Sequence, residues 1–318
     1  MENLVFSLNS TMPLFLIMLL GYLLHQKGFL EDSFVASANK FVFKIALPVQ
    51  LFRDLATTDI YANFDGKYVL FCFVSTLISI LVIWFLARHL LKDKNIVGEF
   101  VQACYRSSAA ILGAAFIQNI YGTSGMSGLM ILGSVPLYNI FAVLILTIES
   151  PSADAQTGMS DKIKASIKGI FTNPILIGIA LGFVYSLLCL PMPTIASKTL
   201  SNIASLTSPL ALLAIGAGFK GKAALGYLKP TVVATLVKLV ILPAVFLPLA
   251  VKCGFTNEKL VALLVMLGSI STPSGYVMAK QMGHEGVLSG SVCVTTTFFS
   301  ALTLTFWVWL AHGMGYIV

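Results

Sequence analysis

The chain has 318 residues, of which 57% are hydrophobic and 10% are charged, and its formal net charge is +7. Ordinary soluble domains carry about 25% charged residues, so this composition excludes a soluble globular protein, and the high hydrophobicity excludes a disordered chain. We therefore expect an all-α polytopic membrane protein, whose basic excess reports membrane topology and not binding of nucleic acid.

Apolar runs follow one another along the whole chain. A spanning helix needs about 20 apolar residues, and the runs predict ten transmembrane helices at roughly 4–24, 35–55, 68–91, 97–121, 129–148, 173–190, 204–219, 231–251, 259–282 and 288–312. The longest polar gap, residues 149–172, has the composition of a flexible linker.

The distribution of Lys and Arg predicts the orientation of these helices. Alternate loops and helix ends carry twelve basic residues on one side and five on the other. Basic residues are enriched in cytoplasmic loops, so the first side, which includes the linker, is expected to face the cytoplasm. With ten spans, both termini then lie outside a plasma membrane.

The two halves of the chain share a pattern. Thr11-Met12-Pro13 corresponds to Thr172-Asn173-Pro174, and the same offset of 161 residues relates Gly21 to Gly182 and Pro48 to Pro209. Residues 1–148 and 173–318 would then be two repeats of five helices in inverted orientation, a layout of many secondary transporters. A duplicated membrane scaffold without transport activity is the alternative.

The ninth span is predicted to be broken near its middle. Pro273 and Gly275 lie in an apolar run beside Ser271, Thr272 and Ser274. Proline removes a backbone donor, and freed backbone groups in a membrane need partners or a wet cavity. The second half-helix would present free N–H groups to an anion. An ordinary proline kink is the alternative.

The fourth span has no proline, and its unwinding is left open. It carries Ser107, Ser108 and Gly113, followed by Ala115, which could continue a helix. In an inverted repeat the fourth and ninth spans cross, which would bring these small and polar residues together. Asn139 in the fifth span must find a hydrogen-bond partner, and both helix packing and substrate contact remain open for it.

Three basic residues lie within predicted spans: Lys44, Arg106 and Lys238. Lys44 is close enough to a helix end for its ammonium to reach the membrane surface. Buried charges usually face a cavity or a partner, and charges of one sign favour an anionic substrate. A purely structural role is the alternative for each.

No enzyme motif is convincing. Residues 216–222, GAGFKGK, match the start of a phosphate loop, but Ala223 replaces the required Ser or Thr and the stretch ends a membrane span. The five cysteines are scattered without a Cys-x-x-Cys pair, so free thiols and no metal site are expected.

Several motifs together resemble the auxin efflux carrier family along nearly the whole chain. They are NKFVFKIALPVQLF (39–52), FTNPILIGIALGF (171–183), PLALLAIGAGF (209–219), KLVILP (238–243) and STPSGYVMAKQMG (271–283). The short central linker is similar to that of bacterial members, which are associated with malate, malonate and similar carboxylates.

The resemblance implies a fold similar to that of bile-acid sodium symporters. Spans 1, 2, 6 and 7 would form a scaffold that often dimerises, and spans 3–5 and 8–10 a transport domain with crossing helices 4 and 9. Pro273 and Gly275 match the second crossover, and Asn139 matches a polar pocket position. Ser108 and Ala115 stand where the family commonly has Asn and Pro.

The sequence thus predicts a secondary transporter that moves a small organic anion by alternating access and forms a homodimer in the lipid bilayer. No cofactor is expected, and the coupling ion, Na⁺ or H⁺, stays open. An anion channel or membrane sensor with the same crossover site is the first alternative, and an intramembrane enzyme is the second. The candidate substrate-binding residues are Ser107, Ser108, Gly113, Asn139, Ser271, Thr272, Ser274 and Gly275, with Arg106 and Lys238 as electrostatic and Pro48, Pro209, Pro273 and Ala115 as structural positions.

Overall fold

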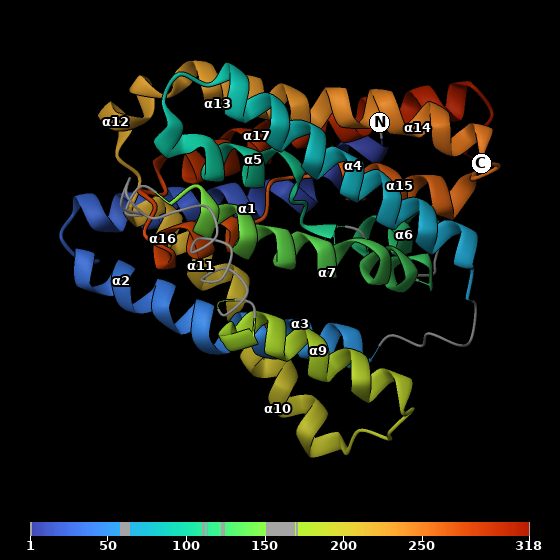
Figure 1. Cartoon of the computed structure of the whole chain (residues 1–318), viewed down its shortest axis with the longest axis horizontal. Coiled ribbons are helices and arrows are strands. Elements are labelled where there is room, and N and C mark those ends of the chain that lie inside the picture. The colour runs from blue at the N-terminus through green and yellow to red at the C-terminus, as the bar shows by residue number, and fades with distance from the viewer. Residues whose placement is uncertain are drawn as a thin grey trace.

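The structure is a computed structural model and describes residues 2–57, 64–109, 112, 114–121, 125–150, 169 and 171–317. The described residues are predominantly helical and form no strand; their one isolated bridge pairs Ser107 with Ser271. Figure 1 shows most of the helices running along the long axis of the molecule. Gly113 and nearly all of the predicted linker lie outside the described residues.

Six helical segments are long and apolar enough to cross a membrane. Two of them join consecutive helices: α10 (Thr194–Ser205) with α11 (Thr207–Ala217), and α13 (Leu228–Leu236) with η4 (Val237–Ile241) and α14 (Leu242–Lys252). The other four segments belong to α1 (Glu2–Gln26), α4 (Gly66–Leu90), α7 (Gly125–Ile148) and α17 (Val287–Gly313). A polytopic all-helical protein is therefore confirmed, with six spans by length and composition.

The four other predicted spans are helical but charged, short or broken. The second consists of α2 (Asp32–Phe41), η1 (Val42–Ala46) and α3 (Leu47–Ala56), and the sixth is α9 (Pro174–Leu187). The fourth divides into α5 (Val97–Tyr105), preceded by η2 (Lys94–Ile96), and α6 (Ala114–Tyr121). The ninth divides into α15 (Asn257–Gly268) and α16 (Pro273–Gln281). A short helix, α12 (Gly221–Gly226), follows α11.

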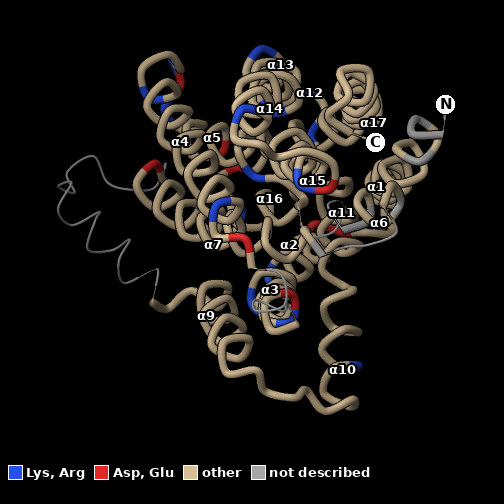
Figure 2. The backbone as a smooth tube through the Cα atoms, turned by 90° about the vertical axis from the view of Figure 1, so that its right-hand side faces the viewer, with Lys and Arg blue, Asp and Glu red and all other residues tan. Residues whose placement is uncertain are grey.

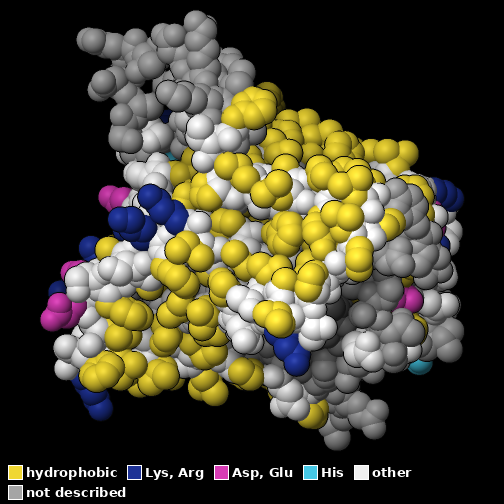
Figure 3. Space-filling model, turned by 90° about the horizontal axis from the view of Figure 1, so that it is seen from below, with side chains coloured by type: hydrophobic (Ala, Val, Ile, Leu, Met, Phe, Trp, Pro, Cys, Tyr) yellow, Lys and Arg dark blue, Asp and Glu magenta, His cyan; other side chains and the backbone are white. Residues whose placement is uncertain are grey.

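The exterior is apolar in the way a membrane requires. Leu16, Phe85 and Trp309 are large hydrophobic residues with more than half of their surface exposed. Figure 3 shows hydrophobic side chains across the middle of one face, while charged side chains gather mostly at its two ends. Lipid is the environment in which such a surface is stable, because exposed apolar patches of this extent are rare on soluble monomers.

Two helix pairs pack unusually closely, and they correspond to each other. α1 packs along α11, and α3 packs along α9. A Cβ atom at Gly21 would lie 2.4 Å from the carbonyl oxygen of Leu213, and one at Gly182 would lie 2.6 Å from that of Phe52. The offset that relates Gly21 to Gly182 also relates Phe52 to Leu213, so the same contact occurs twice with the roles of the halves exchanged.

The helices surround a central element. Figure 2 looks along the long axis and places α16 near the middle, with α9 and α10 at one edge and α13 and α14 at the opposite edge. Figure 1 gives the same arrangement from the side. The broken ninth segment therefore lies inside the bundle, where its freed backbone groups can find protein partners.

Substituting the two equivalent glycines should destabilise the protein to a similar extent. Gly21→Ala and Gly182→Ala each force a carbonyl group away from the helix contact, and overpacking of this kind costs about 1–3 kcal/mol. The apparent melting temperature of the purified protein measures the loss. Gly226→Ala is the matched control, because no atom lies within 4 Å of its Cβ position. Equal melting temperatures for all four proteins would contradict the close packing.

The start of α4 should contribute a small pH-dependent stabilisation. Asp65 accepts from Lys259 Nζ at 2.5 Å and from the amide of Tyr68 at 3.0 Å, and the lysine hydrogen bond above all lowers the pKa of this carboxyl below its ordinary 3.8. The stabilisation should be complete above the ordinary pKa and should be lost as the pH falls through the lowered one. A double-mutant cycle of Asp65→Asn and Lys259→Met should give about 0–1 kcal/mol at pH 7, as for other exposed pairs, and the coupling should decrease as the pH falls below the ordinary pKa. A coupling unchanged by pH would contradict this assignment.

Candidate functional site

The interruption of the fourth span, between α5 and α6, pairs with the interruption of the ninth span, between α15 and α16. Ser107 and Ser271 form an antiparallel bridge, and the amide of Ser108 donates to the carbonyl of Ile270 at 3.1 Å. The amide of Ser271 donates to Thr296 Oγ1 of α17 at 3.0 Å. These contacts replace helical hydrogen bonds that the breaks lack, so the fourth span is unwound without a proline.

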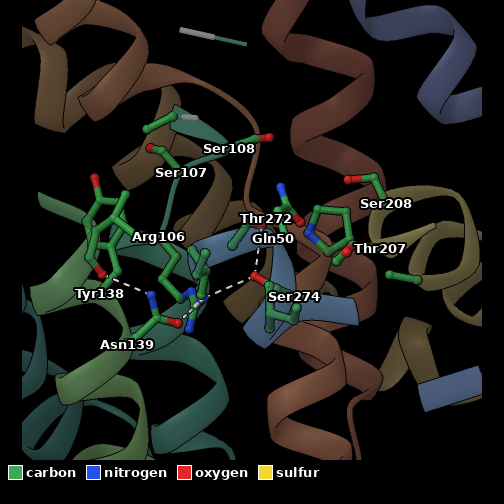
Figure 4. Close-up of a pocket in the computed structure, with 16 residues that line it drawn as sticks. Gln50, Arg106, Ser107, Ser108, Tyr138, Asn139, Thr207, Ser208, Thr272 and Ser274 are labelled. Carbon is green, nitrogen blue, oxygen red and sulfur yellow. Dashed lines mark hydrogen bonds between the residues drawn. The ribbon is translucent and has the colours of Figure 1, made fainter. Parts of the chain in front are cut away.

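A pocket of about 60 Å³ lies beside this crossing (Figure 4). Its wall combines both breaks with α3, α7 and α11, so five separate parts of the chain contribute to it. The lining residues are Leu47, Gln50, Leu51, Arg106, Ser107, Ser108, Ala109, Val135, Tyr138, Asn139, Thr207, Ser208, Ala211, Thr272, Pro273 and Ser274. The pocket is thus assembled only when the chain is folded.

Among the described residues of the wall, Arg106 alone is charged, and it is 3% exposed. Its Nη1 donates to Gln102 Oε1 at 3.2 Å and to Met278 Sδ at 2.9 Å. Its Nη2 donates to Asn139 Oδ1 at 3.1 Å and to Ser274 Oγ at 3.0 Å (Figure 4). Nε has no partner, and no carboxylate in the described part of the chain pairs with Arg106. The guanidinium is held in place by neutral groups, and its charge is not neutralised.

The first turn of α16 also faces the pocket. Thr272 is the N-cap and Pro273 the first helical residue, and no side chain caps this turn. Pro273 has no amide hydrogen, and the amide of Gly275 donates to the carbonyl of Thr272 at 2.9 Å, so this turn offers fewer free amide groups than an ordinary helix start. A helix N-terminus carries a partial positive charge. In the opposite wall, the buried hydroxyl of Thr207 has no hydrogen-bond partner. Guanidinium and helix N-terminus therefore present charges of the same sign to one small cavity.

The structure brings half of the sequence-predicted residues into the pocket wall. Ser271 and Gly275 lie beside the wall: Ser271 is part of the bridge, and the carbonyl of Gly275 accepts from Gln102 Nε2 at 3.0 Å. The predicted residues that line the pocket are Arg106, Ser107, Ser108, Asn139, Thr272, Pro273 and Ser274.

The remaining predicted positions lie farther from the pocket or are not described. Lys238 bonds to the carbonyl of Tyr105, behind the break. Pro48 and Pro209 belong to α3 and α11, next to lining residues of those helices. Gly113 lies outside the described residues, and Ala115 is part of α6.

The sequence reasoning missed the polar residues of α3 and α11. Gln50 is two residues beyond Pro48, and Thr207 and Ser208 immediately precede Pro209. The repeated proline therefore marked the correct region of both helices. A proline alone indicates a structural position, and only the fold shows that its polar neighbours face the pocket.

Comparisons with known proteins agree on one class. The family model described as membrane transport protein matches residues 6–308. The uncharacterized transporter YfdV of Escherichia coli (strain K12) is 24% identical over 326 residues, covering 97% of this chain and 99% of that protein. The uncharacterized transporter MJ1031 of Methanocaldococcus jannaschii is 23% identical over 312 residues, covering 93% and 96%.

If Arg106 serves a ligand and not the fold, its charge should be dispensable for stability. Arg106→Met keeps most of the volume and removes a buried charge without an ionic partner, so the melting temperature of the ligand-free protein should stay the same or rise. Arg106→Ala leaves a cavity and should lower it. An equal, large loss in both variants would show instead that the guanidinium mainly holds the breaks together.

Proposed function

Because the chain belongs to the membrane transport protein family, we propose that it is a secondary transporter that carries a small organic anion across the membrane. The membership confirms the resemblance seen in the motifs, and the similarity to two proteins named as transporters agrees with it. A transporter is thus the supported class, and the anionic substrate is the proposal.

One observation carries the choice of an anion. The buried guanidinium of Arg106 has an unpaired Nε, and the uncapped N-terminus of α16 faces the same cavity. Two positive groups in a membrane interior repel each other and cost free energy unless an anion enters between them. A carboxylate has the planar geometry that a guanidinium binds best.

The shape of the pocket supports alternating access. A volume of about 60 Å³ accommodates a carboxylate group but not a drug-sized ligand, whose pockets measure roughly 300–1,000 Å³. One wall is formed by α3 and α11, and the other by α7 and the breaks. Movement of these two walls relative to each other would enlarge the pocket and expose it to one side of the membrane at a time.

The proposal includes the predicted architecture. Ten segments would form two inverted repeats, which the exchanged contacts of Gly21 and Gly182 and the paired breaks support. We place the protein in the plasma membrane, as a homodimer, with both termini outside.

Removal of the Arg106 charge should weaken substrate binding strongly. Purified protein is titrated with a panel of mono- and dicarboxylates, and uptake of the ligands that bind is measured in proteoliposomes. A hydrogen bond to a charged group contributes about 1.5–3 kcal/mol, so Arg106→Met should weaken binding roughly 10- to 150-fold. Lys44→Met is the control, because it removes the same charge at an exposed position.

Two results would contradict the proposal. Equal carboxylate affinity in Arg106→Met and the unmodified protein would place the anion elsewhere. Flux that never saturates, together with single-channel currents, would identify a channel with the same pocket. Saturable uptake whose affinity Arg106→Met lowers and Lys44→Met preserves is the expected result.

A further inference from the structure

A second buried cation lies close to the pocket but outside its wall. Lys238 belongs to η4, within the membrane-spanning segment Leu228–Lys252, and its side chain is fully buried. It lies ten residues from the start of the segment, about 15 Å at 1.5 Å per residue. A lysine near the end of a span can extend its ammonium to the membrane surface, but Lys238 lies too deep to do so.

The wide turn at η4 has a local cause. Pro243 has no amide hydrogen for the carbonyl of Leu239, which accepts instead from Trp307 Nε1 at 3.0 Å. A π-helical turn adds one residue to the helical turn and is frequent at functional sites. Lys238 lies in this turn, so its position relative to α5 depends on the distortion.

The ammonium of Lys238 is directed at the end of α5. Nζ donates to the carbonyl of Tyr105 at 3.1 Å and to Ser107 Oγ. Tyr105 is the last residue of α5, and Arg106 already has an extended conformation (φ −72°, ψ 129°). The last carbonyls of a helix lack helical partners and carry a partial negative charge.

The same contacts reach the end of α15. Ser107 Oγ donates to the carbonyl of Met266, which also accepts from Tyr138 Oη at 3.1 Å. Met266 lies in the last turn of α15, which ends at Gly268. Lys238 therefore contacts one half-helix end directly and the other through a single hydroxyl group.

Backbone carbonyls and a hydroxyl at half-helix C-termini are the ligands that transporters use for a coupling cation. Here the described oxygens are occupied by an ammonium that belongs to the chain. No carboxylate in the described ranges pairs with Lys238, so helix ends and hydroxyl groups alone offset its charge.

We propose that the ammonium of Lys238 is a tethered cation that takes the place of a bound coupling ion at the joined ends of α5 and α15, so that this site assembles without Na⁺. The inference deepens the proposed function. It rests on that function in one respect, because only a transporter has a coupling ion that Lys238 could replace. A carrier built this way transports its anion with no requirement for a sodium gradient.

The test replaces the tethered cation by a free one. Lys238→Ala removes the atoms of n-propylammonium, which should re-enter the space and restore the contacts. In choline chloride the apparent melting temperature of Lys238→Ala should fall by roughly 5 °C or more, since a buried charged contact is lost. Propylammonium or Na⁺ should recover it in a saturable way, whereas n-propanol, of the same shape without charge, should not.

Two controls separate this effect from general salt effects. Lys44→Ala removes an exposed lysine from another π-helical turn, η1, and should show no cation dependence. The unmodified protein should have the same melting temperature in NaCl, KCl and choline chloride, and should bind no ²²Na⁺ saturably.

Saturable binding of Na⁺ to the unmodified protein would overturn the proposal, and this measurement stands even if Lys238→Ala fails to fold. A Lys238→Ala protein that responds equally to propylammonium and n-propanol would overturn it as well. Neither readout involves an anionic substrate. Failure of carboxylate transport would therefore leave this inference intact, and failure of the inference would leave the Arg106 pocket intact.

Discussion

A helix that stops inside a membrane leaves its last carbonyls and its next amide groups without partners, and hydrocarbon supplies none. In this protein two such interruptions satisfy each other, through the Ser107–Ser271 bridge and the bond from Ser108 to Ile270. The rest of the site depends on this pairing. It fixes where helix ends occur in the bundle interior, and therefore where partial charges of each sign are presented.

The two buried cations relate to these ends in opposite ways. Lys238 contacts the carbonyl ends of α5 and, through Ser107, of α15, where a positive charge is stabilised. Arg106 shares its cavity with the amide end of α16, where a positive charge is not stabilised. The first arrangement is complete within the chain. In the second, no described group offsets the positive charge of Arg106, and a substrate anion would offset it.

The sequence was informative about helices and breaks for a clear physical reason. The length of an apolar run and the pair Pro273 and Gly275 determine helix structure locally. The helical segments and the break in the ninth span could therefore be predicted. The break in the fourth span could not, because it depends on hydrogen bonds to residues about 160 positions away. The length of the sixth span was overestimated, because α9 ends at Leu187 and an apolar run does not report where a helix ends.

In the candidate site, too, single residues could be predicted from the sequence, but the contacts between them could not. Arg106, Asn139 and Ser274 were recognised as separate features, but only the fold shows that one guanidinium contacts both other side chains. Asn139 illustrates this best, because its Nδ2 donates to Val135 and its Oδ1 accepts from Arg106. It bonds to its own helix and orients a pocket residue at once, and its contact with a substrate stays a prediction.

The central claim is that an anion occupies the space between Arg106 and the first turn of α16. The most direct test is an experimental structure determined with a carboxylate that binds the purified protein saturably. We predict carboxylate oxygens within hydrogen-bond distance of Arg106 Nε and of a free amide at the start of α16. A carboxylate bound away from both groups, with Arg106 Nε still unpaired, would contradict the account.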